Sequence, residues 1–346
     1  MKRRDLLKTM ALSMVIPQIV KGGETAVREK DSIKPRCLSE GDKVGIVAPA
    51  TAANDPDEIK RAEEVVKYFG LIPVFGKTLR SAEGYKTKSV QARADDINEM
   101  FANSEIKAVL PIRGGYGSAK ILNSLDYKVI ADNPKIFCGY SDITAMHLAI
   151  HKMTGMICMH GPVLLSDFTP FSEDYYKKAI FSKNPIGEVK NSSTKSGIRE
   201  QNATRTIVPG KAKGKLIGGN LSLVSALMGT QYEPDFNGKI VFLEDVGEEP
   251  YSIDRMLTQL RIGDKLDQAA AVVIGRCKDC VQKSAPAVWD GALGDVLDAN
   301  LSDLKIPVFY GLNIGHTSDQ ATLPIGVEAE LNSELGVITI TESACQ

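Results

Sequence analysis

The sequence predicts an α/β protein with an N-terminal parallel-sheet α/β domain and a second α/β domain that begins near Gly214. Short apolar runs alternate with segments of helical periodicity along most of the chain, which favours parallel strands joined by right-handed crossovers. From 166 to 213 this alternation weakens, and Pro, Ser, Asn and Lys become frequent, as in a linker. We therefore expect domains at 27–165 and 214–346, separated by a linker region at 166–213.

The N-terminal domain is expected to gather its loops at one edge of the sheet. Its apolar runs predict strands, and apolar residues three or four apart predict helices, the first of which opens on Asp-Pro-Asp-Glu. The carboxyl ends of parallel strands form the edge where sites in such sheets lie, so the loop 113–117 and Ser141, which both follow strands, should lie there. The expected strands are 43–48, 71–75, 108–112, 136–138 and 156–159, and the expected helices are 55–68, 90–101, 118–125 and 143–150.

The C-terminal domain also alternates predicted strands with predicted helices. An apolar run at 239–243 ends directly in Glu244 and Asp245, which places both carboxylates at a strand end. Two further runs, separated by the turn at 332–336, predict a closing hairpin. The expected strands are 239–243, 271–274, 308–311, 327–331 and 337–341, and the expected helices are 221–228, 251–262 and 287–299.

Composition excludes several classes of partner. The chain has 346 residues, of which 43% are hydrophobic and 25% charged, as in an ordinary globular protein. Its formal net charge of −1, with no basic cluster, argues against nucleic acid or an anionic membrane surface as a partner. No apolar run is long enough to span a bilayer, so we expect no transmembrane span in the mature chain.

The N-terminus carries an export signal in our interpretation. A basic start is followed by a mostly apolar run from Thr9 to Val20, which is typical of a signal peptide. The Arg3-Arg4 pair resembles a twin-arginine signal, so 1–26 is read as a signal and the protein as periplasmic or exported. An amphipathic N-terminal helix, an uncleaved anchor and a cytoplasmic location remain the alternatives.

The six cysteines are compatible with an oxidising compartment. Cys138 and Cys158 lie in apolar runs and are expected to be buried thiols. Cys277 and Cys280 form a C-x-x-C pair that has no partner pair at zinc-site spacing and does not open a helix. A local disulfide is therefore favoured over a metal or redox role.

The stretch from Pro134 to Ile150 predicts a strand, a tight turn and a helix, with Ser141 at the apex of the turn. Such a turn exposes a hydroxyl beside a helix N-terminus, where backbone amides can hold an oxyanion, so Ser141 is a candidate nucleophile. The usual elbow has a second glycine where this chain has Ile143. The alternative is that Ser141 and Asp142 only cap the helix.

A serine nucleophile needs a base and a group that orients it. His147 and His151 lie one helical turn apart without the glutamate of a zinc-protease motif, so we expect surface or packing roles for them. His160 follows a strand and should line the site, and His316 lies in a glycine-flanked loop; both remain candidates for the base. Glu244 is the candidate orienting acid, with a surface pair beside Asp245 as the alternative.

Six short motifs occur in order along the chain: Arg113-Gly-Gly-Tyr-Gly117, Gly139-Tyr-Ser-Asp142, His160-Gly-Pro162, Gly218-Gly-Asn220, Phe242-Leu-Glu-Asp245 and Gly315-His316. Together they resemble the LD-carboxypeptidases, the murein tetrapeptide carboxypeptidases grouped with the microcin-immunity serine peptidases. The resemblance extends from about Gly41 to Leu331. It implies a parallel α/β N-terminal domain, a linker, and a smaller C-terminal domain, with domain closure completing the site.

The resemblance also implies a triad of Ser141 as nucleophile, Glu244 as orienting acid and His316 as base, and so decides between the two histidines. It implies an oxyanion hole from backbone amides, which by position are those of Asp142 and of Gly114 or Gly115. The reaction would release D-alanine from a murein peptide substrate without a metal or cofactor. A homodimer is a further family expectation.

A carboxypeptidase must also bind the free carboxylate of its substrate, and the guanidinium fork matches a carboxylate. Arg113 is the candidate, with a structural ion pair as the alternative, and Arg255 is a weaker one. His160 is retained as a residue that lines the substrate site. Two other functions stay open: a non-catalytic periplasmic binding protein, and a hydrolase of a microcin-type acyl-sulfamoyl adenylate.

Overall fold

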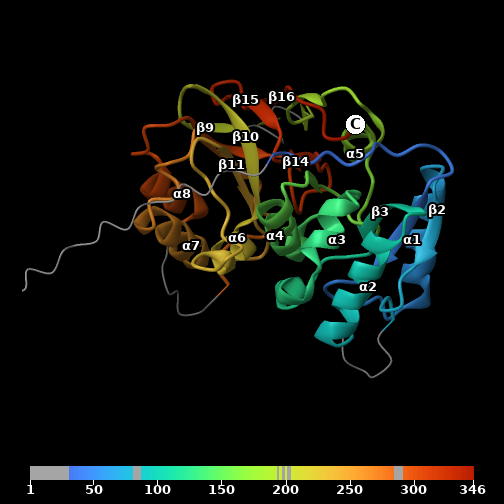
Figure 1. Cartoon of the computed structure of the whole chain (residues 1–346). Coiled ribbons are helices and arrows are strands. Elements are labelled where there is room, and N and C mark those ends of the chain that lie inside the picture. Colours follow the sequence, from blue (N-terminus) through green and yellow to red (C-terminus); the bar gives the residue numbers. More distant parts are fainter. Residues whose placement is uncertain (1–30, 81–86, 193–194, 197–198, 201–203, 284–290) are drawn as a thin grey trace, which may run out of the picture.

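The computed structural model describes residues 31–80, 87–192, 195–196, 199–200, 204–283 and 291–346, and it confirms the predicted α/β class. Figure 1 shows the N-terminal half, coloured blue to green, beside a C-terminal half coloured yellow to red. The first half is built on a six-stranded sheet and the second on an eight-stranded sheet. Within these ranges, no helix has the length and apolar character needed to cross a membrane. The expected signal sequence at 1–26 lies outside them.

The first sheet brings the carboxyl ends of parallel strands to one edge. Its strands are β1 (Lys43–Val47), β2 (Ile72–Phe75), β3 (Ile106–Pro111), β4 (Ile136–Gly139), β5 (Cys158–His160) and β14 (Leu323–Ile325). Their order is β14-β5-β4-β3-β1-β2, and β14 alone among them runs antiparallel to its neighbour. The loops that follow β1, β3 and β4 therefore lie together at one edge of the sheet. The segment that precedes β4 lies at the opposite edge.

Side chains fix where the N-terminal helices begin. Asp55 accepts a hydrogen bond from the amide of Asp57 over 2.9 Å, and Ser89 accepts one from Ala92 over 3.2 Å. The segment predicted as an α-helix from 118 is a short 3₁₀-helix, whose first residue is tied to Asp142. The helices are α1 (Pro56–Tyr68), α2 (Val90–Ala102), η1 (Ser118–Ser124), α3 (Tyr127–Asp132), η2 (Ser141–Ile143) and α4 (Thr144–Thr154).

The second sheet has a parallel centre. Its strands are β6 (Gly187–Val189), β9 (Arg205–Val208), β10 (Lys211–Asn220), β11 (Ile240–Glu244), β12 (Ala271–Gly275), β13 (Val308–Leu312), β15 (Glu328–Asn332) and β16 (Val337–Ile340). Strands β10 to β13 are parallel neighbours, and β15 and β16 form the predicted hairpin. The helices α6 (Leu221–Leu227), α7 (Pro250–Ile262) and α8 (Leu293–Leu301) lie together beside this sheet (Figure 1). The helix predicted from 287 begins at Leu293, and 287–290 lie outside the described residues.

The segment 166–213, expected to be a linker, contains regular structure. Helix α5 (Pro170–Phe181) begins at the cap Thr169 and buries Tyr175 and Tyr176 against the core. The same segment supplies β6, β9 and the start of β10, together with the two-residue strands β7 (Lys195–Ser196) and β8 (Arg199–Glu200). In the sequence, the polar residues of α5 obscured the helical spacing of its apolar residues.

The two halves are joined at several places. β14 lies between β13 and β15 of the second sheet along the chain, but it pairs with β5 of the first sheet, with Leu323 opposite His160. A disulfide between Cys37 and Cys345 links the two ends of the described chain. The expected local disulfide between Cys277 and Cys280 is confirmed. Cys138 and Cys158, also as expected, are buried free thiols.

Candidate active site

Ser141 lies in a strained turn between β4 and α4. Its φ of 63° falls in the left-handed region, which a residue with a side chain enters at a cost of about 1–3 kcal/mol. Such strain is concentrated at functional sites, and a serine in a strand-to-helix turn of this kind is typical of a nucleophile elbow. The residue is half-buried and lines a pocket, so its hydroxyl is accessible.

The loop after β3 approaches Ser141 closely. A Cβ placed on Gly114 would lie 3.0 Å from Cβ and 3.2 Å from Oγ of Ser141, so a side chain at 114 would crowd the hydroxyl. Among the described residues, the amides of Gly114 and Gly115 donate no hydrogen bond to the protein. The amide of Asp142 lies in the first turn of η2, where helix amides lack intrahelical partners. Gly114 and Gly115 line the same pocket as Ser141, and Asp142 follows it in the chain, so these three amides are the candidate donors.

Buried side chains hold these loops in register. Arg93, only 2% exposed, donates to the carbonyl of Gly117 over 3.0 Å and also to that of Pro49. The carboxylate of Asp142 accepts a hydrogen bond from the amide of Ser118 over 2.7 Å. The loops after β1, β3 and β4 thus form one interlocked unit at the predicted edge.

Glu244 and His316 form a hydrogen-bonded pair. Glu244 ends β11 with no exposed side-chain surface, and its Oε2 accepts a hydrogen bond from Nδ1 of His316 over 2.8 Å. His316 follows β13 and exposes 15% of its side chain. A proton held on Nδ1 leaves Nε2 as the basic nitrogen, which is the arrangement a general base requires.

The pair lies next to the strand that presents Ser141. The ring of Tyr140 packs edge-on against the imidazole of His316, with 4.8 Å between ring centroids. Burial raises the pKa of Tyr140, which keeps its phenol neutral. Within the described part of the chain, no hydrogen bond joins Ser141 to His316. The structure therefore brings the three candidates to one neighbourhood and hydrogen-bonds two of them.

A pocket of about 360 Å³ opens in front of Ser141. Arg113 lies on its wall, and its Nη1 is 2.9 Å from Oε1 of Glu58 in a partly exposed ion pair. Both the expected and the alternative role of Arg113 thus have support, since the pair leaves its other donors unused. The lining residues are Glu58, Arg61, Arg113, Gly114, Gly115, Tyr140, Ser141, Val163, Leu165 and Ser166. Arg255 is exposed on α7, stacked on Tyr251, and does not line the pocket.

His160 takes a different place from the one expected. It is completely buried and does not line the pocket, so it offers no surface to a substrate. Burial lowers its pKa to about 4, and that of His147 to about 3, so both rings are neutral at pH 7. His147 is a packing residue, as expected, and contacts Phe137 edge-on.

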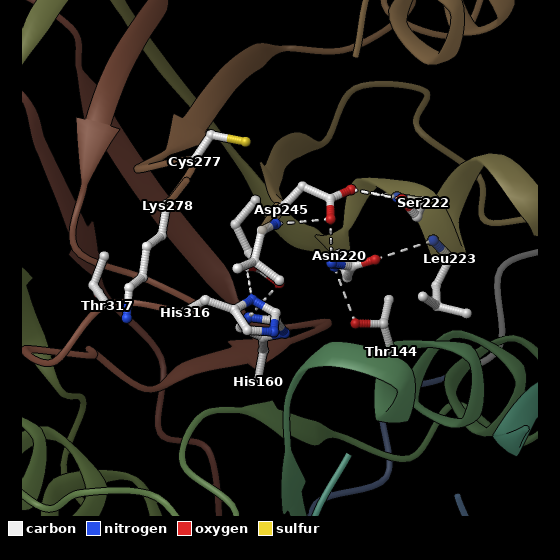
Figure 2. Close-up of polar contacts among 12 residues, drawn as sticks. Thr144, His160, Asn220, Ser222, Leu223, Asp245, Cys277, Lys278, His316 and Thr317 are labelled. Atoms are coloured by element: carbon white, nitrogen blue, oxygen red, sulfur yellow. Dashed lines mark hydrogen bonds and ion pairs between the residues drawn. The ribbon is translucent and has the colours of Figure 1, made fainter. Parts of the chain in front are cut away.

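A buried polar network borders the site and was not predicted. The carboxylate of Asp245 accepts hydrogen bonds from Asn220, Ser222 and the amide of Val246 over 2.8–3.0 Å. Burial raises the pKa of Asp245. The amide of Asn220 donates to Oγ1 of Thr144 over 3.0 Å, which ties the two halves together (Figure 2). The Gly-Gly-Asn and Glu-Asp motifs were the available sequence signals.

One lysine extends toward the loop that carries His316. Lys278 lies in the loop between Cys277 and Cys280, and Figure 2 shows its side chain extending toward Thr317, next to His316.

The described residues contain no group of three or more His, Cys, Asp or Glu side chains that could hold a metal ion.

Comparisons with known proteins cover both halves. The family model described as LD-carboxypeptidase N-terminal domain matches residues 44–161, and the one described as LD-carboxypeptidase C-terminal domain matches residues 213–331. A probable murein peptide carboxypeptidase of Bacillus subtilis is 39% identical over 305 residues, which cover 87% of this chain and 92% of the relative.

Solved structures agree. The microcin C7 self immunity protein MccF, in complex with aspartyl sulfamoyl adenosine, matches with a TM-score of 0.80 and 26% identity, covering 91% of this chain and 100% of the other. A muramoyltetrapeptide carboxypeptidase from Oxalobacter formigenes matches with a TM-score of 0.72 and 28% identity, covering 87% of this chain and 99% of the other.

Proposed function

Because the chain belongs to the LD-carboxypeptidase family, we propose that it is a serine carboxypeptidase that releases terminal D-alanine from murein tetrapeptides. The observation that carries the proposal is the 2.8 Å hydrogen bond between Glu244 and His316, placed beside the turn that presents Ser141. A binding protein would not require a buried carboxylate to orient an imidazole at this position.

The proposed chemistry divides into two halves. Nε2 of His316 accepts the proton of Ser141 as Oγ attacks the carbonyl carbon of the L-residue, and Glu244 stabilises the imidazolium that forms. Amides of Gly114, Gly115 and Asp142 are the proposed donors to the oxyanion. His316 then gives its proton to the departing amine of D-alanine, and the C–N bond breaks to leave an ester on Ser141. Water, activated by His316, hydrolyses the ester.

Arg113 is the proposed partner of the terminal carboxylate of the substrate. It lies in the same pocket as Ser141, and its free donors can form charge-assisted hydrogen bonds to a carboxylate while one nitrogen remains on Glu58. Requiring that carboxylate would restrict hydrolysis to the last peptide bond.

The proposal is tested by measuring D-alanine released from a purified murein tetrapeptide. Ser141→Ala removes the nucleophile at a position whose backbone it can retain, so the variant should fold and lose about 10⁴ to 10⁶ in kcat. Ser302→Ala, at an exposed site beyond α8, is the matched control and should keep full activity. Release by Ser141→Ala at the wild-type rate would reject the assignment.

A second substrate class is supported by the structural match to MccF bound to aspartyl sulfamoyl adenosine. The same nucleophile and base could hydrolyse the amide of an acyl-sulfamoyl adenylate. Parallel kinetics with the tetrapeptide and with aspartyl sulfamoyl adenosine would decide. A higher kcat/KM for the adenylate would replace the murein assignment while leaving the proposed triad in place.

Export is proposed from the basic and then apolar N-terminal segment, so the substrate would be peptide stems outside the cytoplasm. Cell fractionation tests this, and recovery of the full-length protein in the cytoplasm would contradict it. A homodimer is a second proposal, and sedimentation analysis of the purified protein would reject it if only monomer were found.

A further inference from the structure

His160 lies directly behind the acid of the candidate triad. It ends β5, between Gly139 of β4 and Leu323 of β14, and exposes none of its side chain. Its Nε2 is 3.9 Å from Oε1 of Glu244, whereas Oε2 of the same carboxylate accepts the hydrogen bond from His316.

The facing atoms of this contact lack partners. Among the described residues, Oε1 of Glu244 and both ring nitrogens of His160 are buried without a hydrogen bond. Buried polar atoms are nearly always paired, because a desolvated atom without a partner loses the hydrogen bonds that it made to water. The separation exceeds a normal hydrogen bond by about 1 Å, a gap that a small side-chain movement closes.

The surroundings determine which protonation state His160 can contribute. Titratable groups face its ring from four elements: Glu244 on β11, His316 after β13, His147 on α4 and Tyr140 after β4. Burial keeps the imidazole neutral, so it carries one N–H and one acceptor nitrogen. A neutral ring can donate to a carboxylate without placing a second positive charge beside His316.

We propose that His160 is a positioning residue for the acid of the triad: its Nε2–H donates to Oε1 of Glu244 and holds Oε2 on His316 during turnover. The inference rests on the proposed function. With both oxygens engaged, the carboxylate keeps its rotation while His316 carries the proton of Ser141. This replaces the substrate-binding role expected from the sequence, which the complete burial of His160 does not support.

Three variants isolate the donor. His160→Gln keeps an N–H near the position of Nε2, His160→Leu removes every donor, and His160→Asn keeps an amide too short to reach Glu244. We expect His160→Leu and His160→Asn to lower kcat about 10- to 100-fold with KM nearly unchanged, as for a lost hydrogen bond to a charged group, and His160→Gln to retain most activity.

A pH profile separates positioning from packing. The rate at which a fluorophosphonate labels the protein reports the nucleophile without depending on the peptide substrate. Without the donor, the ionised form of Glu244 is less stable, so the acid limb of this profile should move to higher pH in His160→Leu and His160→Asn, and return in His160→Gln. His160→Asn provides the test if His160→Leu does not fold.

The outcomes are distinct. Wild-type rates and an unshifted acid limb in His160→Asn would overturn the inference, and so would equal losses in His160→Asn and His160→Gln with the wild-type pH profile. Failure of the wild-type protein to react with the probe would overturn the proposed function itself, and the inference with it. Labelling of the wild type without release of D-alanine would reject only the substrate.

Discussion

Gly315 leaves the space that the carboxylate of Glu244 occupies. A Cβ at 315 would lie 2.0 Å from Oε2 and 2.2 Å from Cδ of Glu244, and the residue has a φ of 74°. The glycine before His316 is therefore required on two grounds, since any side chain would clash with the acid and would strain the backbone. The loop that carries the candidate base is thus shaped around the acid.

Gly315→Ala should accordingly abolish most activity. The added methyl group displaces Glu244 from Nδ1 of His316, and we expect kcat to fall at least about 10²-fold, because misplacement of about 1 Å at such a site has that effect. Gly229→Ala is the matched control, with a φ of 77° and nothing within 4 Å of the added carbon. Peptidase assays and melting curves of both variants give the measurement. Equal activity in the two would contradict the account.

Arg113 should act on KM through the substrate carboxylate. Arg113→Ala is expected to raise KM for the tetrapeptide about 10-fold, by loss of a charge-assisted hydrogen bond in a partly exposed pocket. A tetrapeptide with an amidated C-terminus lacks the partner group, so the wild type and Arg113→Ala should hydrolyse it with similar kcat/KM. A tenfold difference that persists on the amidated peptide would show that Arg113 acts only through its ion pair with Glu58.

Two buried histidines should make the fold acid-sensitive. Their folded pKa values, about 3 for His147 and about 4 for His160, lie below the ordinary value of 6.5, so the unfolded chain binds more protons between these limits. The stability they confer is complete above pH 6.5 and falls as the pH drops toward 4 and then 3, by up to about 1.4 kcal/mol per pH unit for each ring.

His147→Leu should halve that contribution. Urea unfolding at intervals between pH 4 and 8 gives the free energy of unfolding for the wild type and the variant, and the variant should show the shallower slope. Above pH 7 neither histidine titrates, so the difference measured there reports packing alone. Parallel curves across the whole range would show that His147 is not buried as a neutral ring.

The long-range disulfide should stabilise the fold far more than the local one. Cys37 and Cys345 are separated by 308 positions, and Cys277 and Cys280 by 3. Chain-entropy arguments give a stabilisation of about 5–6 kcal/mol for the first pair and below about 2 kcal/mol for the second. Unfolding of Cys37→Ala/Cys345→Ala and of Cys277→Ala/Cys280→Ala tests this, and an equal loss in both would refute it.

Local patterns predicted the elements that carry the site. The strand, turn and helix around Ser141, the strand that ends in Glu244 and the loop at Gly114 all follow from apolar runs and turn residues within about ten positions. Long-range contacts were not readable in this way. The three-residue strand β14 joins the first sheet only through pairing with β5, and Cys37 meets Cys345 from the far end of the chain.

The burial of His160 could not be predicted from the sequence either, because it depends on long-range contacts. The residue follows a strand, as a site residue should, but its surroundings are built by β11, α4 and β14 together. Helix α5 was not predicted because its apolar side is narrow. That side becomes evident only when the core against which it packs is known. A single sequence shows the spacing of apolar residues and the residues that favour turns. It does not determine which elements pack against one another.

The central claim is that Ser141 is the nucleophile of this protein, and mapping the residue modified by a fluorophosphonate tests it most directly. The account predicts one covalent adduct, located by peptide mass spectrometry on Ser141 and lost in Ser141→Ala. An adduct on a different serine, or active protein that takes up no label, would contradict it.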